Sequence, residues 1–531
     1  MNKITCIVCA LTLMTLAACA GGGGGGGSSV PIGPGGPAAM TLSATAGDAQ
    51  VTFTFGYVSG ATGYTLYYDT SSGVTPMTGT PVPMGSTPFP LTGLTNGTTY
   101  YAVATYTDAT GESAASAQVS ATPQAPSSSP YDPSWATVTP TNTVPFTGSA
   151  TQLEAAMNAL TPGDKMEIAA GTYNLTSKFN LDVQGTAAAP IWIGPASGAT
   201  VVINMTATQN IMNIGENSQT KYLCIRGVEF TGISHGIRFY DCTQVWFDGN
   251  HVHNTGDACI TTNTRDTSYM YITRNDLHDT GGTGEGMYLG ANNGTVIMSN
   301  SIVALNHVHD THGSGSGAQG DGIELKQGSY GNLIAENLVH DTSYPCILVY
   351  GTAGNAQNIV ERNVCYNSGD NAMQIQGECI VRNNLCINGA GSAFASQVHQ
   401  GNPTNLQVVH NTFVNGAGRA AKLSSWAGAA NMVFANNACY STGNWAIDCN
   451  GISGVTFAGN VCFGSVTSGI TFTTGNGLSD FVNVTTNGSN RDAHPSGGSA
   501  LLTAANATYA TAKDLEGTTR VAPHDAGCYE G

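Results

Sequence analysis

The stretch Ile302–Thr311, IVALNHVHDT, returns 31 residues later as Leu333–Thr342, LIAENLVHDT. Each copy has a short apolar strand, an asparagine, and then a polar turn. The asparagine recurs at intervals of 21 to 31 residues, at positions 250, 275, 306, 337, 363, 384, 411, 437 and 460. A repeat of this length with variable loops is typical of a solenoid. Because the strands are short, rich in Val and Ile and without helical periodicity, the repeat predicts an all-β, single-stranded parallel β-helix.

The recurring asparagines are interpreted as structural. An asparagine amide can bond its own turn and the next coil at once, so a column of them forms a ladder. The repeat resembles the right-handed, pectate-lyase-like parallel β-helices, and this likeness implies a domain over residues 145–531. Its edges resemble those of the same proteins, with an amphipathic capping helix at Ser149–Leu160 and a closing segment at Arg520–Gly531.

The second strand of each coil shows which side chains point outward. Alternation places Ile323 and Leu325 inside and Glu324 and Lys326 outside. Stacking the equivalent strands predicts two outward columns. One contains Arg238, Tyr288, Glu324, Leu348, Gln374, Lys422 and Asp448, and the other contains Gly290, Lys326, Tyr350, Gln376 and Gln397.

Acidic side chains gather on two adjacent coils of a chain in which only 9% of residues are charged. Glu285, Asp321 and Glu324 converge there beside Lys326. Carboxylates stacked about 4.8 Å apart repel one another unless a cation lies between them. Ca²⁺ suits such oxygen ligands, and a lysine beside a divalent cation is disfavoured in its charged form and can act as a base. The alternative is a solvated charged face.

The segments Gly284–Gly290 and Gly320–Ser329 resemble the alginate lyases and chondroitinase B among the β-helix polysaccharide lyases. This resemblance implies calcium-dependent β-elimination on a uronic-acid polymer, alginate- or pectate-like, with Glu285 and Glu324 as calcium ligands and Lys326 as the base. The family's catalytic arginine has no counterpart, because Tyr350 stands in its place. Tyr350 and His399 are therefore the two candidates for the second catalytic group.

Further residues on the same face are predicted to hold an acidic polysaccharide. They are Arg238, Tyr288, Gln374, Gln376, Arg419, Lys422 and Trp426. A second column, His253, His278, His309 and His340, lies three residues after successive ladder asparagines. A metal site is one interpretation of it, and a stacked ladder of turn residues is the interpretation favoured here.

Other functions remain open at this point. Asp257–Ile260 and Asp321–Glu324 are similar to the paired aspartate motifs of polygalacturonase-type inverting hydrolases, although the adjacent Asp-Asp and the His-Gly motif of those enzymes are absent. A uronate C5-epimerase would share the first step of the lyase. A non-catalytic surface adhesin is the third possibility. The net charge of −17 argues against a nucleic-acid partner.

The region before the β-helix has three parts. Residues 1–19 resemble a bacterial lipoprotein signal ending in Leu16–Cys19, which implies lipidation of Cys19 and anchoring in the cell envelope, at the outer membrane; the alternative is an ordinary secretory signal. Residues 20–37 form a glycine-rich tether. Residues 38–122 read as alternating strands, and Gly93–Tyr100 resembles part of a fibronectin type III domain.

Residues 123–144 are predicted to be a linker, and the protein is expected to be a monomer. Beyond the signal peptide eleven cysteines remain, an odd number, and they lie mostly in apolar strand contexts. We expect them to be buried as small hydrophobic residues.

Overall fold

The computed structural model describes residues 39–531 apart from 48–49, 86, 124–128 and 316. The predicted signal peptide, its lipidation site Cys19 and the glycine-rich tether lie outside the described residues. The chain divides into two units, residues 1–127 and 128–531, and each is described by itself. No helix in the described part of the chain is long and apolar enough to cross a membrane.

The first unit is a small antiparallel β-sandwich. One sheet has the order β1–β2–β5, and the other has the order β4–β3–β6–β7 with β8 also paired to β6. Its core is filled from both sheets by side chains such as Val51, Phe53 and Leu66. The strands are β1 (Leu42–Gly47), β2 (Gln50–Phe55), β3 (Gly63–Asp69), β4 (Thr80–Pro83), β5 (Phe89–Thr92), β6 (Tyr100–Asp108), β7 (Gly111–Glu112) and β8 (Val119–Ala121).

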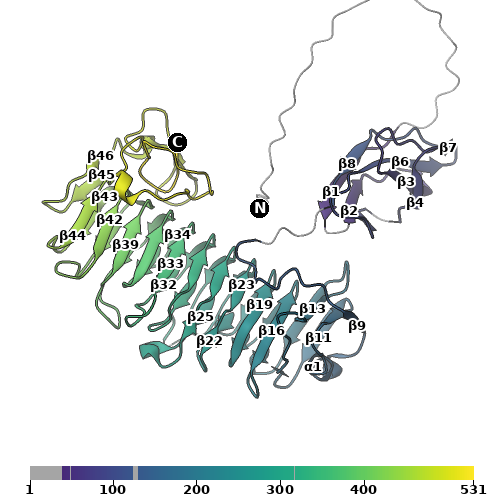
Figure 1. Cartoon of the computed structure of the whole chain (residues 1–531), viewed down its shortest axis with the longest axis horizontal. Helices are drawn as coiled ribbons and strands as arrows, with labels where there is room; N and C mark the ends of the chain where they lie inside the picture. The colour runs from purple at the N-terminus through teal and green to yellow at the C-terminus, as the bar shows by residue number, and fades with distance from the viewer. Residues whose placement is uncertain (1–38, 48–49, 86, 124–128, 316) are drawn as a thin grey trace, which may run out of the picture. The chain divides into compact units, whose positions relative to one another are not determined.

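The second unit is a parallel β-helix, as the repeat predicts (Figure 1). Successive coils stack so that their strands form three parallel ladders. The first ladder consists of β9 (Asn142–Phe146), β10 (Asp164–Ile168), β13 (Ile191–Pro195), β16 (Thr220–Arg226), β19 (Cys242–Asp248), β23 (Tyr271–Thr273), β27 (Ile302–Ala304), β30 (Leu333–Ala335), β33 (Asn358–Glu361), β36 (Cys379–Arg382), β39 (Leu406–Val409), β42 (Met432–Ala435) and β44 (Val455–Ala458), with β22 (Thr267–Ser268) and β26 (Met298–Ser299) beside it.

The other two ladders belong to one 23-stranded sheet. The second ladder consists of β11 (Gly171–Leu175), β14 (Val201–Met205), β17 (Glu229–Gly232), β20 (His251–Thr255), β24 (Asp276–His278), β28 (His307–Thr311), β31 (Leu338–Thr342), β34 (Val364–Ser368), β37 (Leu385–Gly389), β40 (Thr412–Asn415), β43 (Ala438–Cys449), β45 (Val461–Val466) and β46 (Thr473–Thr474). The third consists of β12 (Asn180–Leu181), β15 (Met212–Ile214), β18 (Ile237–Phe239), β21 (Ile260–Thr261), β25 (Met287–Leu289), β29 (Ile323–Leu325), β32 (Ile347–Val349), β35 (Met373–Ile375), β38 (Ser392–Ser396), β41 (Arg419–Leu423) and the end of β43.

The asparagine ladder lies at the corner between the first and second ladders. In each coil the Asn backbone N–H donates to the side-chain oxygen of the next Asn, as from Asn306 to Asn337 at 3.0 Å. The Nδ2 of Asn306 also donates to the Ile272 carbonyl at 2.8 Å. The series runs unbroken from Asn250 to Asn460. The residue before each of these asparagines has positive φ, for example Leu305 at 61°, which makes the corner tight.

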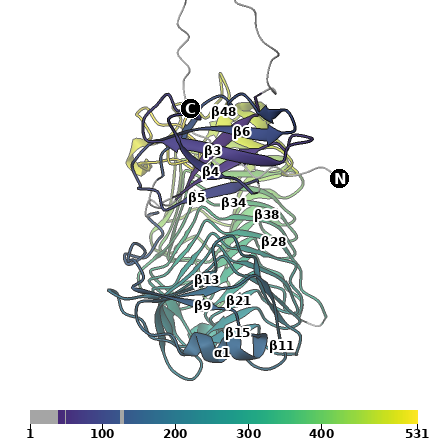
Figure 2. The same cartoon turned by 90° about the vertical axis from the view of Figure 1, so that its right-hand side faces the viewer.

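Apolar side chains from all three ladders fill the interior of the coils. The eleven cysteines of the described residues are all free and buried, which confirms their expected role as small core residues. The helix α1 (Ala150–Asn158) caps the N-terminal end of the stack, with Leu153 and Met157 buried against the first coils (Figure 2). The end of the apolar core is thereby covered.

The predicted linker 123–144 is wrong for the part that the structure describes beyond residue 128. Trp135 is buried and packs edge-on against Trp192 and Trp246 on the outer face of the first ladder. The strand β9 pairs with β10, so regular structure begins at Asn142. This segment is rich in Pro and Ser, but its aromatic residues pack against apolar side chains on the outside of the coils.

The C-terminal segment, which follows the last coil, folds back along the side of the stack. Its hairpin, β47 (Phe481–Val484) and β48 (Arg491–Pro495), and the residues after it form a second apolar cluster on the outer face of the second ladder. Tyr440 and Leu385 of the ladder pack there with Phe481 and Cys528. This segment leaves the outer face of the third ladder to other residues.

Candidate functional site

Three carboxylates meet on the outer side of the third ladder. Glu285 lies two residues before β25, Asp321 lies two residues before β29, and Glu324 is the middle residue of β29. One carboxylate oxygen from each lies within 4.8 Å of one from each of the others. Alternation places Glu324 outside the coil while Ile323 and Leu325 enter the core, as predicted. All three acids are nevertheless almost inaccessible, with 0 to 1% of their surface exposed.

Each of these carboxylates has an oxygen that makes no hydrogen bond. The atoms are Glu285 Oε1, Asp321 Oδ1 and Glu324 Oε2, and all are buried. Burial raises the pKa of all three groups. For Asp321 the neighbouring charges of Glu324 and Glu285 raise the pKa further. Buried oxygens without partners are costly, and three of them side by side could hold a cation.

Lys326 lies against the same cluster. Its Nζ forms an ion pair with Glu324, and only 3% of the residue is exposed. The ammonium also lies 4.2 Å from the centre of the Tyr288 ring and 5.2 Å from that of Tyr350. The lysine is therefore held between two aromatic faces and a carboxylate, which fixes the position of its nitrogen.

A directed chain of hydrogen bonds connects the cluster to His399. Gln374 Nε2 donates to His399 Nδ1 at 2.8 Å, so the neutral imidazole carries its proton on Nε2. His399 Nε2 lies 3.0 Å from the Tyr350 hydroxyl, which in turn donates to Glu324 Oε1 at 3.2 Å. Burial and then the Lys326 charge lower the pKa of His399, which favours this neutral form. Burial raises the pKa of Tyr350, as do the charges of Glu324 and Asp321.

A loop contact that the sequence does not predict involves the loop that carries His399. Gln400, in the loop that carries His399, donates to Asn292 Oδ1 at 3.0 Å and accepts from the Asn293 backbone N–H at 3.0 Å. These partners are more than 100 residues apart in the chain. His399 in this loop packs edge-on against Tyr350, with ring centres 4.7 Å apart, so the loop contributes to the burial of that outward-pointing side chain.

The predicted outward column is confirmed in its register. Tyr288 pairs with Glu324, Glu324 with Leu348, and Leu348 with Gln374. Two positions missing from the prediction complete the column, with Thr261 between Arg238 and Tyr288 and Ala395 between Gln374 and Lys422.

The residues predicted to hold substrate differ in how accessible they are. Arg238, Tyr288, Arg419 and Lys422 are partly exposed, whereas Gln374 and Gln376 are buried beneath the loop that carries His399. Arg419 forms an ion pair with Asp448 at 2.5 Å, and Lys422 donates to Gln397 at 2.8 Å.

The prediction for Trp426 is wrong. Its side chain is fully buried in the interior of the coils, packs against Phe434, and donates to Ser396 at 2.8 Å. Ser425 has a φ of 62°, so the strand alternation stops there and the indole turns inward. The accessible tryptophan of this region is Trp445, which is 38% exposed.

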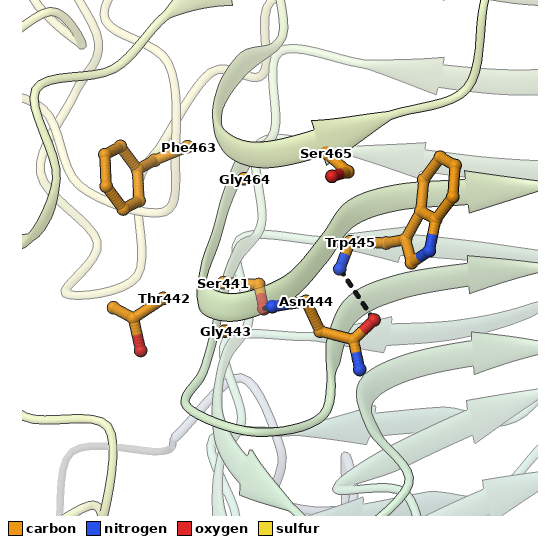
Figure 3. A pocket seen from close by; sticks show the side chains of 8 residues that line it. All are labelled: Ser441, Thr442, Gly443, Asn444, Trp445, Phe463, Gly464 and Ser465. Atoms are coloured by element: carbon orange, nitrogen blue, oxygen red, sulfur yellow. Dashed lines mark hydrogen bonds between the residues drawn. The ribbon is translucent and has the colours of Figure 1, made fainter.

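Trp445 borders an open pocket of about 520 Å³ (Figure 3). Thr442 and Phe463 lie on one side of this pocket and Trp445 on the other. The lining consists of Ser441, Thr442, Gly443, Asn444, Trp445, Phe463, Gly464 and Ser465. Along the third ladder Trp445 lies five coils beyond Asp321. At about 4.8 Å per coil the separation is roughly 24 Å.

Comparisons with known proteins bear on the fold. No curated protein matches this sequence. Among solved structures, an alginate lyase from Paenibacillus sp. str. FPU-7 is 17% identical with a TM-score of 0.39, covering 60% of this chain and 98% of its own. A pectate lyase is 14% identical with a TM-score of 0.43, covering 74% and 97%. A mutant of a periplasmic alginate epimerase is 13% identical with a TM-score of 0.30, covering 60% and 84%. Residues 191–357, which include the carboxylate cluster, match the family model described as a right handed beta helix region.

Proposed function

We propose that this protein is a calcium-dependent polysaccharide lyase that cleaves a uronic-acid polymer by β-elimination. The observation that carries the proposal is the set of three buried carboxylates, each with an unpartnered oxygen, beside Lys326 and Tyr350. Three carboxylates that each keep one unpartnered oxygen offer the hard oxygen ligands that Ca²⁺ takes. Bound there, Ca²⁺ would neutralise a uronate carboxylate and acidify the proton on C5.

The chain's own residues supply the proton transfers. Lys326, in its neutral form, takes the C5 proton, the electron pair forms the C4–C5 double bond, and the C4–O bond breaks. The departing oxygen needs a proton, which Tyr350 provides. The Lys326 ammonium then returns the C5 proton to the Tyr350 phenolate, which His399 stabilises by donating a hydrogen bond from its Nε2–H. Lys326 is thus the base, Tyr350 the acid, and His399 the residue that positions Tyr350.

The same face offers contacts for the rest of the polymer. Arg238 and Lys422 are partly exposed cations in the column through Glu324, on opposite sides of the cluster. Trp445 takes the distal stacking role predicted for Trp426, since an exposed indole can pack against a sugar face. A lipid anchor at Cys19 would keep such an enzyme at the cell envelope, and this localisation stays a prediction from the sequence.

The proposal is tested by incubating the full chain with alginate, pectate and glycosaminoglycans, with and without a calcium chelator. The expected result is ultraviolet absorbance from an unsaturated uronate on one of these polymers, lost with chelator and restored by Ca²⁺. New reducing ends without absorbance would identify a hydrolase instead. Exchange of the C5 proton with solvent without chain cleavage would identify an epimerase. Binding without any of these changes would support the adhesin and contradict the proposal.

A further inference from the structure

A group of histidines and acids covers part of the outer face of the second ladder, away from the carboxylate cluster on the third. Two neighbouring columns of side chains form it, and together they are named the histidine array. One column stacks Glu229, His251, Asp276 and His307 on successive coils, and the other stacks His253, His278, His309 and His340.

The stacked-ladder interpretation accounts for the second column only. Its imidazoles lie nearly parallel, with interplanar angles of 15°, 17° and 12° from His253 to His340, and the stack continues onto Tyr366 at 13°. The histidines of the first column instead turn ring nitrogens toward the second. His251 Nε2 lies 2.7 Å from His278 Nε2, and His307 Nε2 lies 2.9 Å from His340 Nε2. Each pair is joined by a hydrogen bond, and a metal ion that displaces the shared proton would have both nitrogens within reach.

We propose that the array binds two divalent transition-metal ions, with Zn²⁺ the best match. The first site combines His251, His253 and His278 with Glu229, and the second combines His307, His309 and His340 with Asp276. In each set three ligand atoms lie within 4.8 Å of one another, and a fourth residue, Glu229 or His340, contacts one of the histidines among them and would complete the four ligands that tetrahedral zinc takes. The second set repeats the first two coils further along.

Distances within each set support this grouping. One ligand atom each from His251, His253 and His278 lies within 4.8 Å of the other two, and the same holds for Asp276, His307 and His309. His253 Nε2 lies 3.1 Å from Glu229 Oε1. Asp276 Oδ1 lies 3.1 Å from His307 Nδ1 and 3.3 Å from His309 Nε2, yet this buried atom makes no regular hydrogen bond. This oxygen therefore faces two imidazole nitrogens at ion-pair distance.

An aspartate follows three of the four histidines of the second column and orients the ring, whereas His253 is followed by Asn254, whose Nδ2 lies 2.8 Å from His253 Nδ1. Asp279, Asp310 and Asp341 have φ near 50°, and each carboxylate lies 2.6 to 2.7 Å from Nδ1 of the preceding histidine. A carboxylate on Nδ1 fixes the tautomer that leaves Nε2 free to bind a metal. The array has the outer ligands of a metal site as well as the inner ones. Because its histidines are only partly buried, ions can enter from solvent.

Zinc titration of the chelator-treated full chain, made without a histidine tag, tests the proposal by calorimetry. We expect two equivalents of Zn²⁺ in the native chain. The double variants His251→Gln/His278→Gln and His307→Gln/His340→Gln should each keep one equivalent, and their combination should keep none. His312→Gln is the matched control, because His312 lies next to the array but bonds Ser343 at 3.0 Å, and it should keep both.

A second measurement needs no variant. Co²⁺ added to the native chain should give the intense visible bands of a tetrahedral nitrogen–oxygen site, and one equivalent of Zn²⁺ per site should remove them. The absence of these bands, fewer than two equivalents of Zn²⁺ in the native chain, or two equivalents surviving in the combined variant would overturn the proposal. Glu285→Gln, in the carboxylate cluster, should leave Zn²⁺ binding unchanged, which separates this site from the proposed lyase centre.

Discussion

The outer faces of the second and third ladders are built by the same strand alternation, but their polar side chains differ in burial and in hydrogen-bond partners. On the second ladder the histidines of the array are partly buried, and most of their nitrogens face a partner. On the third ladder Glu285, Asp321 and Glu324 are buried and each has an oxygen without one. The difference lies in burial. The carboxylates are almost inaccessible and are therefore desolvated, whereas the histidines remain in contact with water.

The largest expected effect on the third-ladder face follows from removing Lys326. Lys326→Ala should lower the rate of uronate elimination by about 100- to 10,000-fold, because general base catalysis contributes on that scale. The measurement is the initial rate of ultraviolet absorbance on the preferred polymer. Lys165→Ala is a matched control, since Lys165 is exposed and pairs only with Glu167. Full activity in Lys326→Ala would remove the lysine from the mechanism.

The asparagine ladder supports both faces equally, so its loss should affect stability rather than either site. Asn337→Ala should lower the free energy of unfolding by about 1 to 3 kcal/mol, because the buried Asn306 N–H loses its acceptor. Asn174→Ala, at an exposed Asn–Asn pair on the same helix, should cost less than about 0.5 kcal/mol. Denaturant unfolding of both variants provides the comparison, and equal effects would count against the ladder.

The carboxylate face should respond to pH in a direction set by its raised pKa values. A carboxyl whose pKa is raised by folding holds its proton more tightly in the folded chain. Its stabilising contribution is therefore present below its ordinary pKa and is lost as the pH rises through the raised value. With chelator present, the free energy of unfolding of the native protein should fall as the pH rises from about 4 through the raised pKa values of Glu285, Asp321 and Glu324.

Asp321→Asn should flatten that dependence of stability on pH, because the charges of Glu324 and Glu285 both raise the pKa of Asp321. Thermal melting at several pH values in chelator is the measurement. An unchanged profile in the variant would show that the three carboxylates do not repel one another in the folded chain.

The smallest expected effect concerns the far end of the third ladder. Trp445→Ala should weaken binding of long polymer by about 2- to 10-fold, which corresponds to roughly 0.5 to 1.5 kcal/mol for one aromatic contact. Oligosaccharides too short to span about 24 Å should be unaffected. Michaelis constants for short and long substrates test this, and an equal change for both would place Trp445 outside the binding surface.

The local pattern of the sequence was sufficient for the register but not for long-range contacts. The repeat of Asn306 and Asn337 predicts the helix, its corner and the column through Tyr288, Glu324 and Gln374, because alternation and stacking are local rules. The bridge between Gln400 and Asn292 escapes prediction because it joins loops of irregular length.

Two other misses have local causes. The inward direction of the Trp426 side chain depends on the positive φ of Ser425, and the sequence pattern does not predict a positive φ at a serine. Only one column of the histidine array could be predicted. The column through His253 follows from the repeat, but the contacts of His251 and His307 with it depend on the two columns lying side by side in the structure.

The most direct test of the carboxylate face is a calorimetric titration of Ca²⁺ into the chelator-treated full chain and into Glu285→Gln/Asp321→Asn. The account predicts one equivalent of Ca²⁺ for the native chain and none for the variant. It also predicts that His251→Gln/His278→Gln binds Ca²⁺ as the native chain does. A native chain that takes no Ca²⁺, or a carboxylate variant that takes as much as the native chain, would contradict it.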